Sequence, residues 1–423
     1  MKEVGSTERR AFLKWLGALP LLGYIATQGF LEKAFGAAKR SVNNNIYTRI
    51  GVRPVINARG PWTYISSTLE LPEVKVAKQQ AAEYFVDMWE LQRAVGRRLA
   101  ELSGAEAGLV TSGAAGAMAA ATAACIAGTD PAKIWQLPDT TGLKHEVVMF
   151  GGRSLFDSAI RLAGGKLVLA NTPEELQAAL NENTVMVYTT ARGERLERAL
   201  PITKKAGVPM LVDWAASVPP IENLSLPAKM GVDLYTFSGG KGLCGPQCTG
   251  LLLGRKDLIE AALANCNPWE GAVCRPMKVG KEEIMGVLAA VEVWKKTDLD
   301  ALNREWSKRI KRIAQVVETV PGVTTEIQTA YASPVLTVKW NQAAFKLTVA
   351  ECAKKLRDGS PRIEVWTGHN PSAVPGANEG DPKTPRAPRP DQLRIVSLTL
   401  QAGEELLVGR RLREVLAEAR KAA

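Results

Sequence analysis

A lysine and an aspartate near the middle of the chain are the residue pair best suited to covalent chemistry. Lys241 lies in the run FSGGKG at residues 237–242, and Asp213 ends the apolar stretch LVD, 28 residues earlier. An amine of this kind forms a Schiff base with the aldehyde of pyridoxal phosphate (PLP), while an aspartate pairs with the pyridine nitrogen and keeps it protonated. The pair predicts a PLP site with Lys241 and Asp213 as its catalytic residues.

Other interpretations of each residue are open. Taken singly, Lys241 is also typical of a solvated loop and Asp213 of a cap on the following element. A nucleotide-binding loop is a further alternative for Gly-Gly-Lys. It is disfavoured because no glycine lies five residues before Gly240, and because Gly242 follows the lysine where Ser or Thr is required.

A third segment strengthens the PLP hypothesis. Residues 110–116 (VTSGAAG) follow a short apolar stretch and open an alanine-rich run that reaches Gly128, a pattern that predicts a strand, a turn and a helix N-terminus. Unpaired N–H groups at such a terminus suit a phosphate dianion, although small residues also let a helix pack closely on a sheet. A phosphate segment, an aspartate and a lysine in this order are more specific than any one of them.

The elements that must position these residues have the pattern of an α/β fold. Short apolar strands alternate with helical stretches such as 172–180, which implies a mainly parallel sheet covered on both faces. Ligands of such sheets bind beyond the strand C-termini, where Asp213 and Lys241 are expected. The expected strands are 146–150, 166–170, 185–189, 209–213, 234–238 and 250–254.

The pattern changes after Pro268. A long helical region at 280–319 precedes a strand at 333–340, a helix at 348–357, a strand at 392–400 and an amphipathic helix at 404–423, with a Pro- and Gly-rich loop at 368–390. These elements predict a smaller C-terminal α+β domain. We therefore expect a signal and linker at 1–45, a PLP-binding large domain at 46–300 and a small domain at 301–423.

The N-terminus resembles a twin-arginine export signal. Arg9 and Arg10 are followed by Phe-Leu-Lys, by an apolar stretch at 15–26 that is too short to span a bilayer, and by small residues around Ala38. Glu8 departs from the usual Ser or Thr, and an amphipathic N-terminal helix is the alternative. The expectation is a periplasmic or otherwise exported protein that uses the twin-arginine machinery, with an uncleaved membrane anchor also open.

Composition limits the other classes of function. The net charge is +11, of which the first 45 residues hold +4, so the body is only modestly basic. No zinc-finger spacing or basic cluster with interleaved aromatic residues indicates nucleic acid. Six cysteines in 423 residues are not a disulfide framework, although a local Cys244–Cys248 disulfide is conceivable, and with two histidines they match no metal motif. No metal site is expected.

Several longer stretches resemble the selenocysteine synthase-like branch of PLP fold type I enzymes, especially the subgroup of D-glucosaminate-6-phosphate ammonia-lyase. The resemblance spans about residues 46–300 and continues weakly to the C-terminus. The matching stretches are 53–57, 110–116, 126–131, 137–142, 237–241, 245–247 and 275–283.

The resemblance implies a role for several residues. Lys241 would be the Schiff-base lysine and Asp213 the pyridine partner, and the cofactor phosphate would be bound by Ser112, Gly113, Ala114 and Ser238. It also implies an aspartate aminotransferase-like fold with a large cofactor domain. The assembly would be a homodimer or a larger ring with active sites at subunit interfaces.

Two departures from the family pattern affect substrate recognition. Members usually carry a histidine after the Glu-Val-Val strand, where its ring stacks on the cofactor, but residues 151–157 (GGRSLFD) contain none and His145 lies too early. Loss of this ring would weaken cofactor binding unless Phe156 or Arg153 takes its place. Near the start, Arg59 and Trp62 are bulkier than the family pattern.

The leading hypothesis is a PLP enzyme that removes the α-proton of an amino acid or amino sugar acid and continues by β-elimination or a related lyase step. Arg394, in the run QLRIVS, is the candidate for gripping the substrate carboxylate, with a surface strand arginine as the alternative. A selenium transferase acting on charged tRNA is a second hypothesis, which an exported chain disfavours. A non-catalytic PLP-binding paralogue is a third, supported by the missing histidine and opposed by Lys241 and Asp213.

Overall fold

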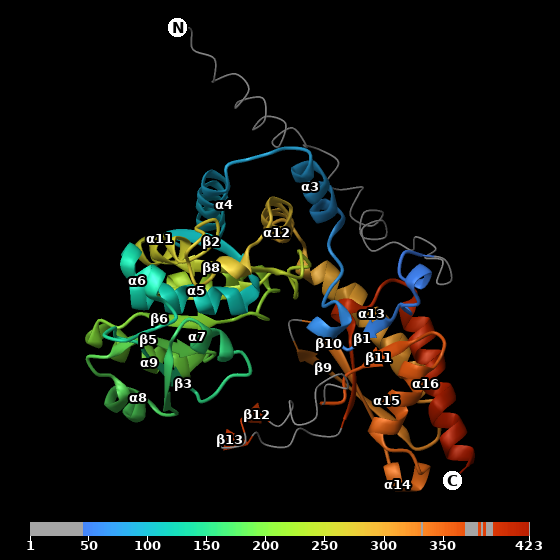
Figure 1. The fold of residues 1–423 in the computed structure, drawn as a ribbon. Coiled ribbons are helices and arrows are strands. Elements are labelled where there is room, and N and C mark those ends of the chain that lie inside the picture. Colours follow the sequence, from blue (N-terminus) through green and yellow to red (C-terminus); the bar gives the residue numbers. More distant parts are fainter. Residues whose placement is uncertain (1–44, 331–332, 369–379, 382–383, 386–391, 423) are drawn as a thin grey trace.

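A seven-stranded sheet forms the centre of the larger part of the molecule (Figure 1). The computed structural model describes residues 45–422, apart from 331–332, 369–379, 382–383 and 386–391. The strand order is β2-β8-β7-β6-β5-β3-β4. The strands are β2 (Ala107–Ser112), β3 (Glu146–Phe150), β4 (Lys166–Ala170), β5 (Thr184–Thr189), β6 (Met210–Asp213), β7 (Leu234–Ser238) and β8 (Thr249–Gly254).

Strand directions confirm the expectation of a mainly parallel sheet. Strands β4, β3, β5, β6 and β7 pair in parallel, whereas β8 runs antiparallel to both β7 and β2. All six strands expected from the sequence between residues 146 and 254 are present, with ends displaced by at most one residue. Because β2 and β7 both run opposite to β8, their C-termini reach the same edge of the sheet as that of β6.

Alternate side chains of the strands enter two separate cores. On β5 and β6, Val187 and Val212 belong to one core, whereas Tyr188 and Leu211 belong to the other. Both cores are filled by apolar helix faces, as a sheet buried on two sides requires. Helices α4, α9 and α12 supply the first core and α5, α6, α7 and α11 the second.

The helices of this larger part include one that is buried almost throughout. In α5 (Gly113–Ala127), 12 of the 15 residues are buried, because an alanine-rich helix has no polar face to turn outward. The others are α3 (Pro72–Ala82), α4 (Met88–Ser103), α6 (Pro131–Gln136), α7 (Ser158–Leu162), α8 (Pro173–Ala179), α9 (Gly193–Ala206), α10 (Leu226–Lys229), α11 (Lys256–Ala264) and α12 (Lys281–Trp294).

The C-terminal elements build a second, smaller α+β unit, on the right in Figure 1. Its antiparallel sheet has the order β14-β10-β9, and a bridge between Trp366 and Arg394 joins it to the parallel pair β1-β11. Most of its apolar side chains form a third core, whereas Leu302 and Trp306 of α13 pack into the first core of the large sheet. The elements are β1 (Ile56–Ala58), β9 (Val323–Ala330), β10 (Ser333–Trp340), β11 (Ile363–Val365), β14 (Leu393–Val396), α13 (Leu299–Val317), α14 (Gln342–Phe345), α15 (Val349–Asp358) and α16 (Glu404–Lys421).

Strand β1 links the two parts of the chain. Although it lies near the N-terminus, Ile56 pairs with Ile363 of β11, and Ile56 and Ala58 are buried in the C-terminal core. The chain then crosses to the large sheet through residues 59–71. The division of the chain at residues 45 and 300 stays a prediction.

The structure corrects three C-terminal boundaries. The helical region at 280–319 is two helices, because Asp298 caps a new one by accepting a 2.9 Å hydrogen bond from Ala301 N. The strand at 392–400 ends at Val396 and continues as a 3-10 turn over Ser397–Thr399. The expected loop at 368–390 lies mostly outside the described residues; within it, β12 (Gly380–Asp381) pairs with β13 (Thr384–Pro385).

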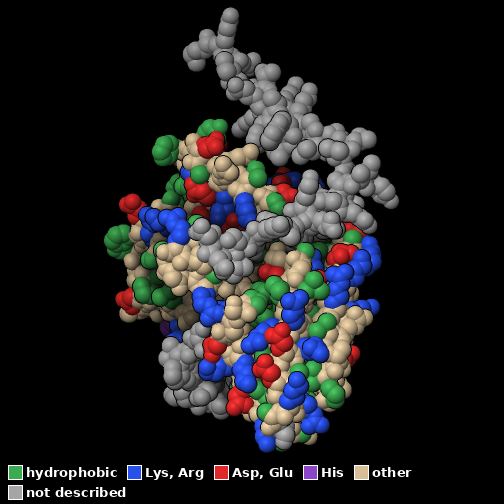
Figure 2. Space-filling view, turned by 90° about the vertical axis from the view of Figure 1, so that its right-hand side faces the viewer, with side chains coloured by type: hydrophobic (Ala, Val, Ile, Leu, Met, Phe, Trp, Pro, Cys, Tyr) green, Lys and Arg blue, Asp and Glu red, His purple; other side chains and the backbone are tan. Residues whose placement is uncertain are grey.

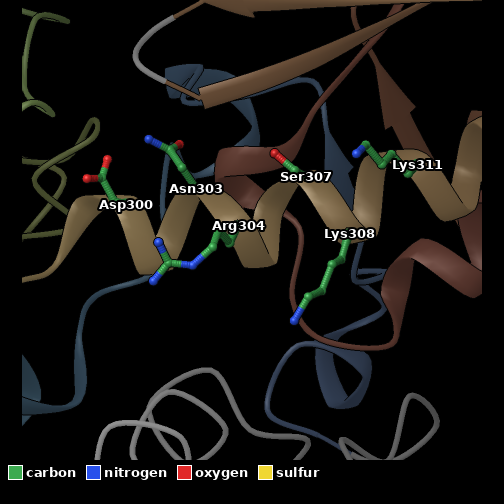
Figure 3. Close-up of a pocket in the computed structure, with 6 residues that line it drawn as sticks. All are labelled: Asp300, Asn303, Arg304, Ser307, Lys308 and Lys311. Atoms are coloured by element: carbon green, nitrogen blue, oxygen red, sulfur yellow. The ribbon is translucent and has the colours of Figure 1, made fainter.

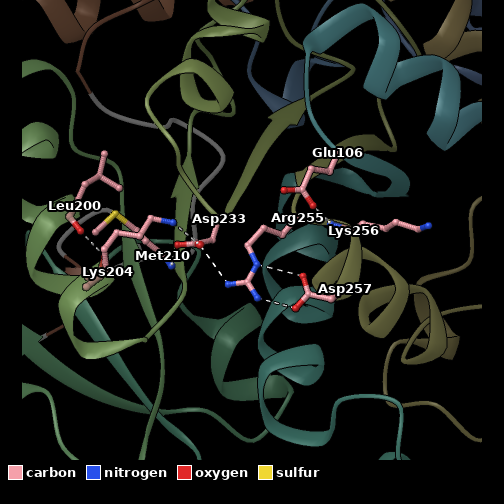
Figure 4. A network of polar contacts seen from close by, with 9 residues as sticks. Glu106, Leu200, Lys204, Met210, Asp233, Arg255, Lys256 and Asp257 are labelled. Carbon is pink, nitrogen blue, oxygen red and sulfur yellow. Dashed lines mark hydrogen bonds and ion pairs between the residues drawn. The ribbon is translucent and has the colours of Figure 1, made fainter.

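A polar network stabilises one edge of the large sheet (Figure 4). This edge lies opposite to the strand ends that carry Asp213 and Ser238. Asp233, immediately before β7, is 3% exposed and accepts from Lys204 Nζ at 2.7 Å, Arg255 at 3.4 Å and Met210 N at 3.0 Å. Arg255 also pairs with Asp257. The network thus joins α9, the start of β6 and the end of β8.

Charged side chains of both signs are interspersed over the face that Figure 2 shows. No helix in the part of the chain that the structure describes is long and apolar enough to cross a membrane.

Candidate active site

Lys241 is presented by a tight turn between β7 and β8. Gly239 N donates to Thr249 O at 2.8 Å, Gly245 N donates to Gly239 O at 2.8 Å, and Cys244 N donates to Lys241 O at 3.0 Å. A Cβ on Gly240 would lie 2.3 Å from Gln247 Cα, so that only glycine fits before the lysine. The small residues of the FSGGKG run therefore fold the turn that places the lysine.

A segment from the N-terminal side of the chain holds this turn in place. Thr68 Oγ1 lies 2.8 Å from Gly240 O and 2.9 Å from Lys241 O, and Ser67 Oγ donates to Gly240 O. Leu71 N donates to Cys244 O at 3.0 Å. Sequence reasoning missed Ser67 and Thr68, because nothing in the local pattern indicates which distant turn their hydroxyls reach.

The Lys241 side chain is partly buried at the end of this turn. Among the residues that the structure describes, none makes a hydrogen bond or an ion pair with its Nζ, which lies 5.7 Å from the ring centroid of Phe156. Burial lowers the pKa of this amine from its ordinary 10.5, and the charge of Asp213 offsets part of the change. A lysine of this kind gives up its proton more easily than a surface lysine.

Asp213 ends β6 with a carboxylate that is 9% exposed. Its Oδ2 accepts a 2.9 Å hydrogen bond from the Tyr188 hydroxyl, and its Oδ1 accepts a 3.0 Å bond from Ala215 N. Both donors are uncharged. Among the described residues no cationic side chain bonds to this carboxylate, so it is placed to pair with a cationic group such as a protonated pyridine nitrogen.

Arg192 is a second cation of this region that sequence reasoning missed. Its guanidinium lies 5.0 Å from the ring centroid of Trp214 and donates to Ser217 Oγ. Burial lowers the pKa of Arg192, and the Asp213 charge raises it. Arg192 and Tyr188 both lie at or beyond the C-terminal end of β5, so the rule that ligands bind beyond strand ends was the signal that could have found them.

The segment predicted to bind phosphate lies at the same edge of the sheet. Ser112 ends β2 opposite Thr249 of β8, and Ser238 ends β7 opposite Gly250. Helix α5 begins at Gly113 with a φ of +68°, and the Ser112 side chain makes no capping hydrogen bond at this N-terminus. The first N–H groups of α5 are thus left for an anion, close to the ends of β7 and β6.

The histidine-free segment at 151–157 does lie beside the lysine. The ring centroid of Phe156, which is 49% exposed, lies 5.7 Å from the Lys241 amine, whereas Arg153 pairs with Asp157. Of the two candidates for the missing ring, Phe156 is the one near Lys241. His145 precedes β3 and so lies at the other edge of the sheet.

Arg59 and Arg394 lie among the residues that join the small sheet to the crossing segment. Arg59 is 2% exposed, its guanidinium is 4.8 Å from the Trp62 ring centroid, and it donates to Val365 O at 3.3 Å. Arg394 on β14 is 4.4 Å from the Trp366 ring centroid and donates to Gln392 Oε1 at 2.6 Å. The role of Arg394 at a substrate carboxylate stays a prediction.

Of two hollows in the described structure, one lies beside the candidate site and the other does not. A cavity of about 150 Å³ lies against Tyr188 and the 151–154 turn; it is lined by Phe150, Gly151, Gly152, Arg153, Ser154, Tyr188 and Thr190. A larger hollow of about 570 Å³ follows one face of α13 (Figure 3), and none of the predicted site residues lines it. Within the described ranges, no group of three or more His, Cys, Asp or Glu side chains could hold a metal ion, and all six cysteines are free.

Comparison with known proteins identifies the class that this fold and site define. The family model described as aminotransferase class-V matches residues 169–380. The chain belongs to this family, and it is a PLP-dependent enzyme of fold type I.

Individual relatives indicate the subgroup of this family that the chain resembles. The chain is 32% identical to a 5'-C-glycyluridine monooxygenase-decarboxylase of Streptomyces, covering 75% of this chain and 83% of the relative. It is 28% identical to D-glucosaminate-6-phosphate ammonia lyase of Salmonella typhimurium, covering 75% and 88%. A solved structure of a D-glucosaminate-6-phosphate ammonia-lyase has a TM-score of 0.71 at 26% identity, covering 89% of this chain and 99% of that chain. The resemblance to the selenocysteine synthase-like group and to this lyase subgroup is thereby confirmed.

The residues at the strand ends fit PLP. Three features of the described residues correspond to the aldehyde, the pyridine nitrogen and the phosphate of the cofactor. They are the partly buried Lys241 amine without a polar partner, the buried Asp213 carboxylate without an ion pair, and the α5 N-terminus without a side-chain cap. When bound, PLP supplies an electron sink that stabilises negative charge at the substrate α-carbon.

Proposed function

We propose that this enzyme removes the α-proton of an amino acid or amino sugar acid and completes a lyase reaction of the β-elimination type. The observation that carries the proposal is the Lys241 amine, which is partly buried, has no hydrogen-bonding partner among the described residues, and lies within the field of Asp213. The similarity to an ammonia lyase supports elimination as the outcome. The similarity to a monooxygenase-decarboxylase shows that another outcome occurs among the relatives.

In this proposal Lys241 has two tasks. Its Nζ would hold PLP when the cofactor is bound, and the same Nζ would accept the α-proton of the substrate. A general base works best with a pKa near the working pH, and burial moves the pKa of Lys241 in that direction. The Phe156 ring centroid lies 5.7 Å from this amine.

The remaining site residues hold and orient the cofactor. Asp213 pairs with the ring nitrogen through a carboxylate whose direction is fixed by Tyr188 and Ala215 N. The phosphate is bound at the α5 N-terminus by Ser112, Gly113 and Ala114, together with Ser238 from β7. Phe156 packs on the ring in place of the family's histidine.

Arg394 is proposed to bind the substrate carboxylate. Its guanidinium is held in one plane by Trp366 and by two bonds to the Gln392 side chain, at 3.2 and 2.6 Å. A fork that is already oriented loses little freedom when it binds two carboxylate oxygens.

Two other functions remain alternatives. The similarity to an L-seryl-tRNA(Sec) selenium transferase of Moorella thermoacetica is 25% identity over 62% of this chain and 60% of the relative, which favours that activity only weakly. A non-catalytic PLP-binding paralogue is opposed by the Lys241 environment, because a lysine whose pKa is lowered by desolvation is typical of functional sites.

Export and assembly complete the proposal. The twin-arginine segment lies outside the described residues, and a periplasmic or membrane-anchored location rests on its sequence alone. A homodimer or larger ring rests on the family resemblance. A cofactor-binding domain at 46–300 and a smaller domain at 301–423 belong to the same proposal.

The reaction is tested by incubating the PLP-loaded enzyme in D₂O with a panel of amino acids and amino sugar acids. Deuterium at the substrate α-carbon is followed by NMR, and ammonia and oxo-acid release by coupled assays. We expect Lys241-dependent exchange with at least one substrate class, followed by ammonia release, and none with Lys241→Ala. Exchange that persists in Lys241→Ala, or the absence of both exchange and product for every substrate, would contradict the proposal.

Export is tested by fractionating cells that express the full chain or its Arg9→Lys/Arg10→Lys variant. Lysine keeps the charge but not the planar pair, so the variant is expected to stay in the cytoplasm while the parent chain leaves it. The same distribution for both proteins would refute the signal.

A further inference from the structure

A buried phenol connects the altered 151–157 segment with the aspartate proposed to pair with the cofactor ring. The Tyr188 hydroxyl lies 2.9 Å from Asp213 Oδ2 and 3.4 Å from Ser154 Oγ. Tyr188 is 2% exposed and comes from β5, the strand next to β6. The three side chains therefore form a continuous path from the turn after β3 to the ring partner.

The direction of the hydrogen bond follows from the environment of Tyr188. Burial, together with the charge of Asp213, raises the pKa of the phenol far above its ordinary value. The hydroxyl thus stays protonated and donates its only hydrogen to the carboxylate, because a carboxylate is a stronger acceptor than the serine hydroxyl. With its hydrogen given to Asp213, the Tyr188 oxygen can only accept a second hydrogen bond. The Ser154 hydroxyl therefore donates to the Tyr188 oxygen.

This path has consequences for Asp213. Each donated hydrogen bond fixes the direction of the carboxylate oxygen that accepts it. Oδ1 accepts from Ala215 N and Oδ2 from Tyr188, each with one bond, so both oxygens retain a free lone pair in a fixed direction. Tyr188 and Ser154 both line the small cavity beside the 151–154 turn.

We propose that Tyr188 is a positioning residue that orients the Asp213 carboxylate toward the cofactor ring nitrogen, and that Ser154 transmits changes in the 151–157 segment to Asp213 through it. Because Tyr188 acts through Asp213, its role rests on the proposed function of Asp213. It extends that function by giving the altered segment an electronic effect on the cofactor in addition to its contact with Lys241.

The test compares Tyr188→Phe with Tyr235→Phe in the full-length, PLP-loaded enzyme. Both substitutions remove one hydroxyl from a tyrosine buried on a strand of the same sheet, but Tyr235 belongs to the other core. We expect Tyr188→Phe to weaken PLP binding about five- to tenfold, and to shift the pH at which the visible absorbance of the bound cofactor changes. Its kcat should fall while KM changes little. Tyr235→Phe should leave binding and the pH profile unchanged.

Ser154→Ala provides a second variant that does not disturb the core. It should shift the same pH profile in the same direction, by less, and the shift should vanish in the Tyr188→Phe background. Equal PLP affinity and equal pH profiles for Tyr188→Phe and Tyr235→Phe would overturn the inference, as would an additive effect of Ser154→Ala.

Asp213→Asn separates this inference from the proposed function. If Asp213→Asn alters PLP affinity and absorbance but Tyr188→Phe does not, only the role of Tyr188 fails. If Asp213→Asn has no effect on either, the assignment of Asp213 as the ring partner fails as well.

Discussion

Two buried aspartates at opposite edges of the same sheet show how this fold separates stability from chemistry. Asp233 precedes β7 and is matched by two cations, Lys204 and Arg255. Asp213 ends the neighbouring β6 and receives only uncharged donors, from Tyr188 and Ala215. A buried charge without an ion pair is costly, so a carboxylate left in this state indicates a site that is completed by a ligand.

The lysines of the two edges differ in the same way. Lys204 ion-pairs with Asp233 at 2.7 Å and is about half exposed, whereas Lys241 is partly buried and makes no ion pair with a described residue. Within the described part of the chain, charges are thus paired at the edge that carries Asp233 and unpaired at the edge where the cofactor is expected. We therefore expect substitutions at the Asp213 edge to change activity and substitutions at the Asp233 edge to change stability.

The largest effect is expected from Asp213→Asn compared with Asp233→Asn. A neutral partner no longer holds the ring nitrogen protonated, and loss of a charge-assisted hydrogen bond costs about 1.5–3 kcal/mol, so kcat/KM should fall about 10- to 150-fold. Steady-state kinetics and urea unfolding are measured for both variants. Asp233→Asn should instead lower the free energy of unfolding by about 1.5–3 kcal/mol with little change in cofactor affinity. An Asp213→Asn enzyme with unchanged turnover would end the assignment.

A smaller effect is expected in the pH dependence of stability. The folded apoenzyme lowers the pKa of Lys241 below 10.5, so between the two values the unfolded chain binds more protons, and stability should rise with pH in that window. Lys241→Met removes this contribution. The stability advantage of the Lys241→Met apoenzyme over the parent should therefore be largest below the lowered pKa and shrink toward pH 10.5, as followed by thermal unfolding. A difference that does not vary with pH would show that the amine is not desolvated.

The smallest effect is expected from Phe156. An aromatic ring packed on the cofactor contributes about 0.5–1.5 kcal/mol, so Phe156→Ala should weaken PLP binding about 2- to 10-fold, and Phe156→His should restore part of it. Fluorescence titration of the apoenzyme measures both. A histidine could also be introduced elsewhere in the 151–157 segment. Gly152 is unsuitable, because its φ of +86° would strain a histidine side chain there. Identical affinity for all three proteins would show that Phe156 does not cover the ring.

Much of this site was predictable because its residues follow strand ends. The apolar runs predicted β6 and β7, and the positions of Asp213 and Lys241 after them predicted one shared edge. Ser67, Thr68 and Tyr188 were not predictable in the same way. The two hydroxyls bond to carbonyls more than 170 residues away, and whether Tyr188 meets Asp213 depends on strand order, which a local pattern does not contain.

The fold shows a similar division. Helix α5 and the strands of the large sheet have strong local patterns, whereas β1 and β11 are three residues long and exist through pairing across about 300 residues. Strand β9 exposes most of its side chains, so it lacks the apolar alternation that would have revealed it.

The most direct test of the central claim is to map the covalent attachment of the cofactor. The PLP-loaded enzyme is reduced with borohydride, digested, and analysed by mass spectrometry, with Lys241→Ala and Lys204→Ala treated in parallel. The account predicts one phosphopyridoxyl adduct, on Lys241, which is absent from Lys241→Ala and unchanged in Lys204→Ala. An adduct on another lysine of the PLP-loaded parent enzyme, or none at all, would contradict it.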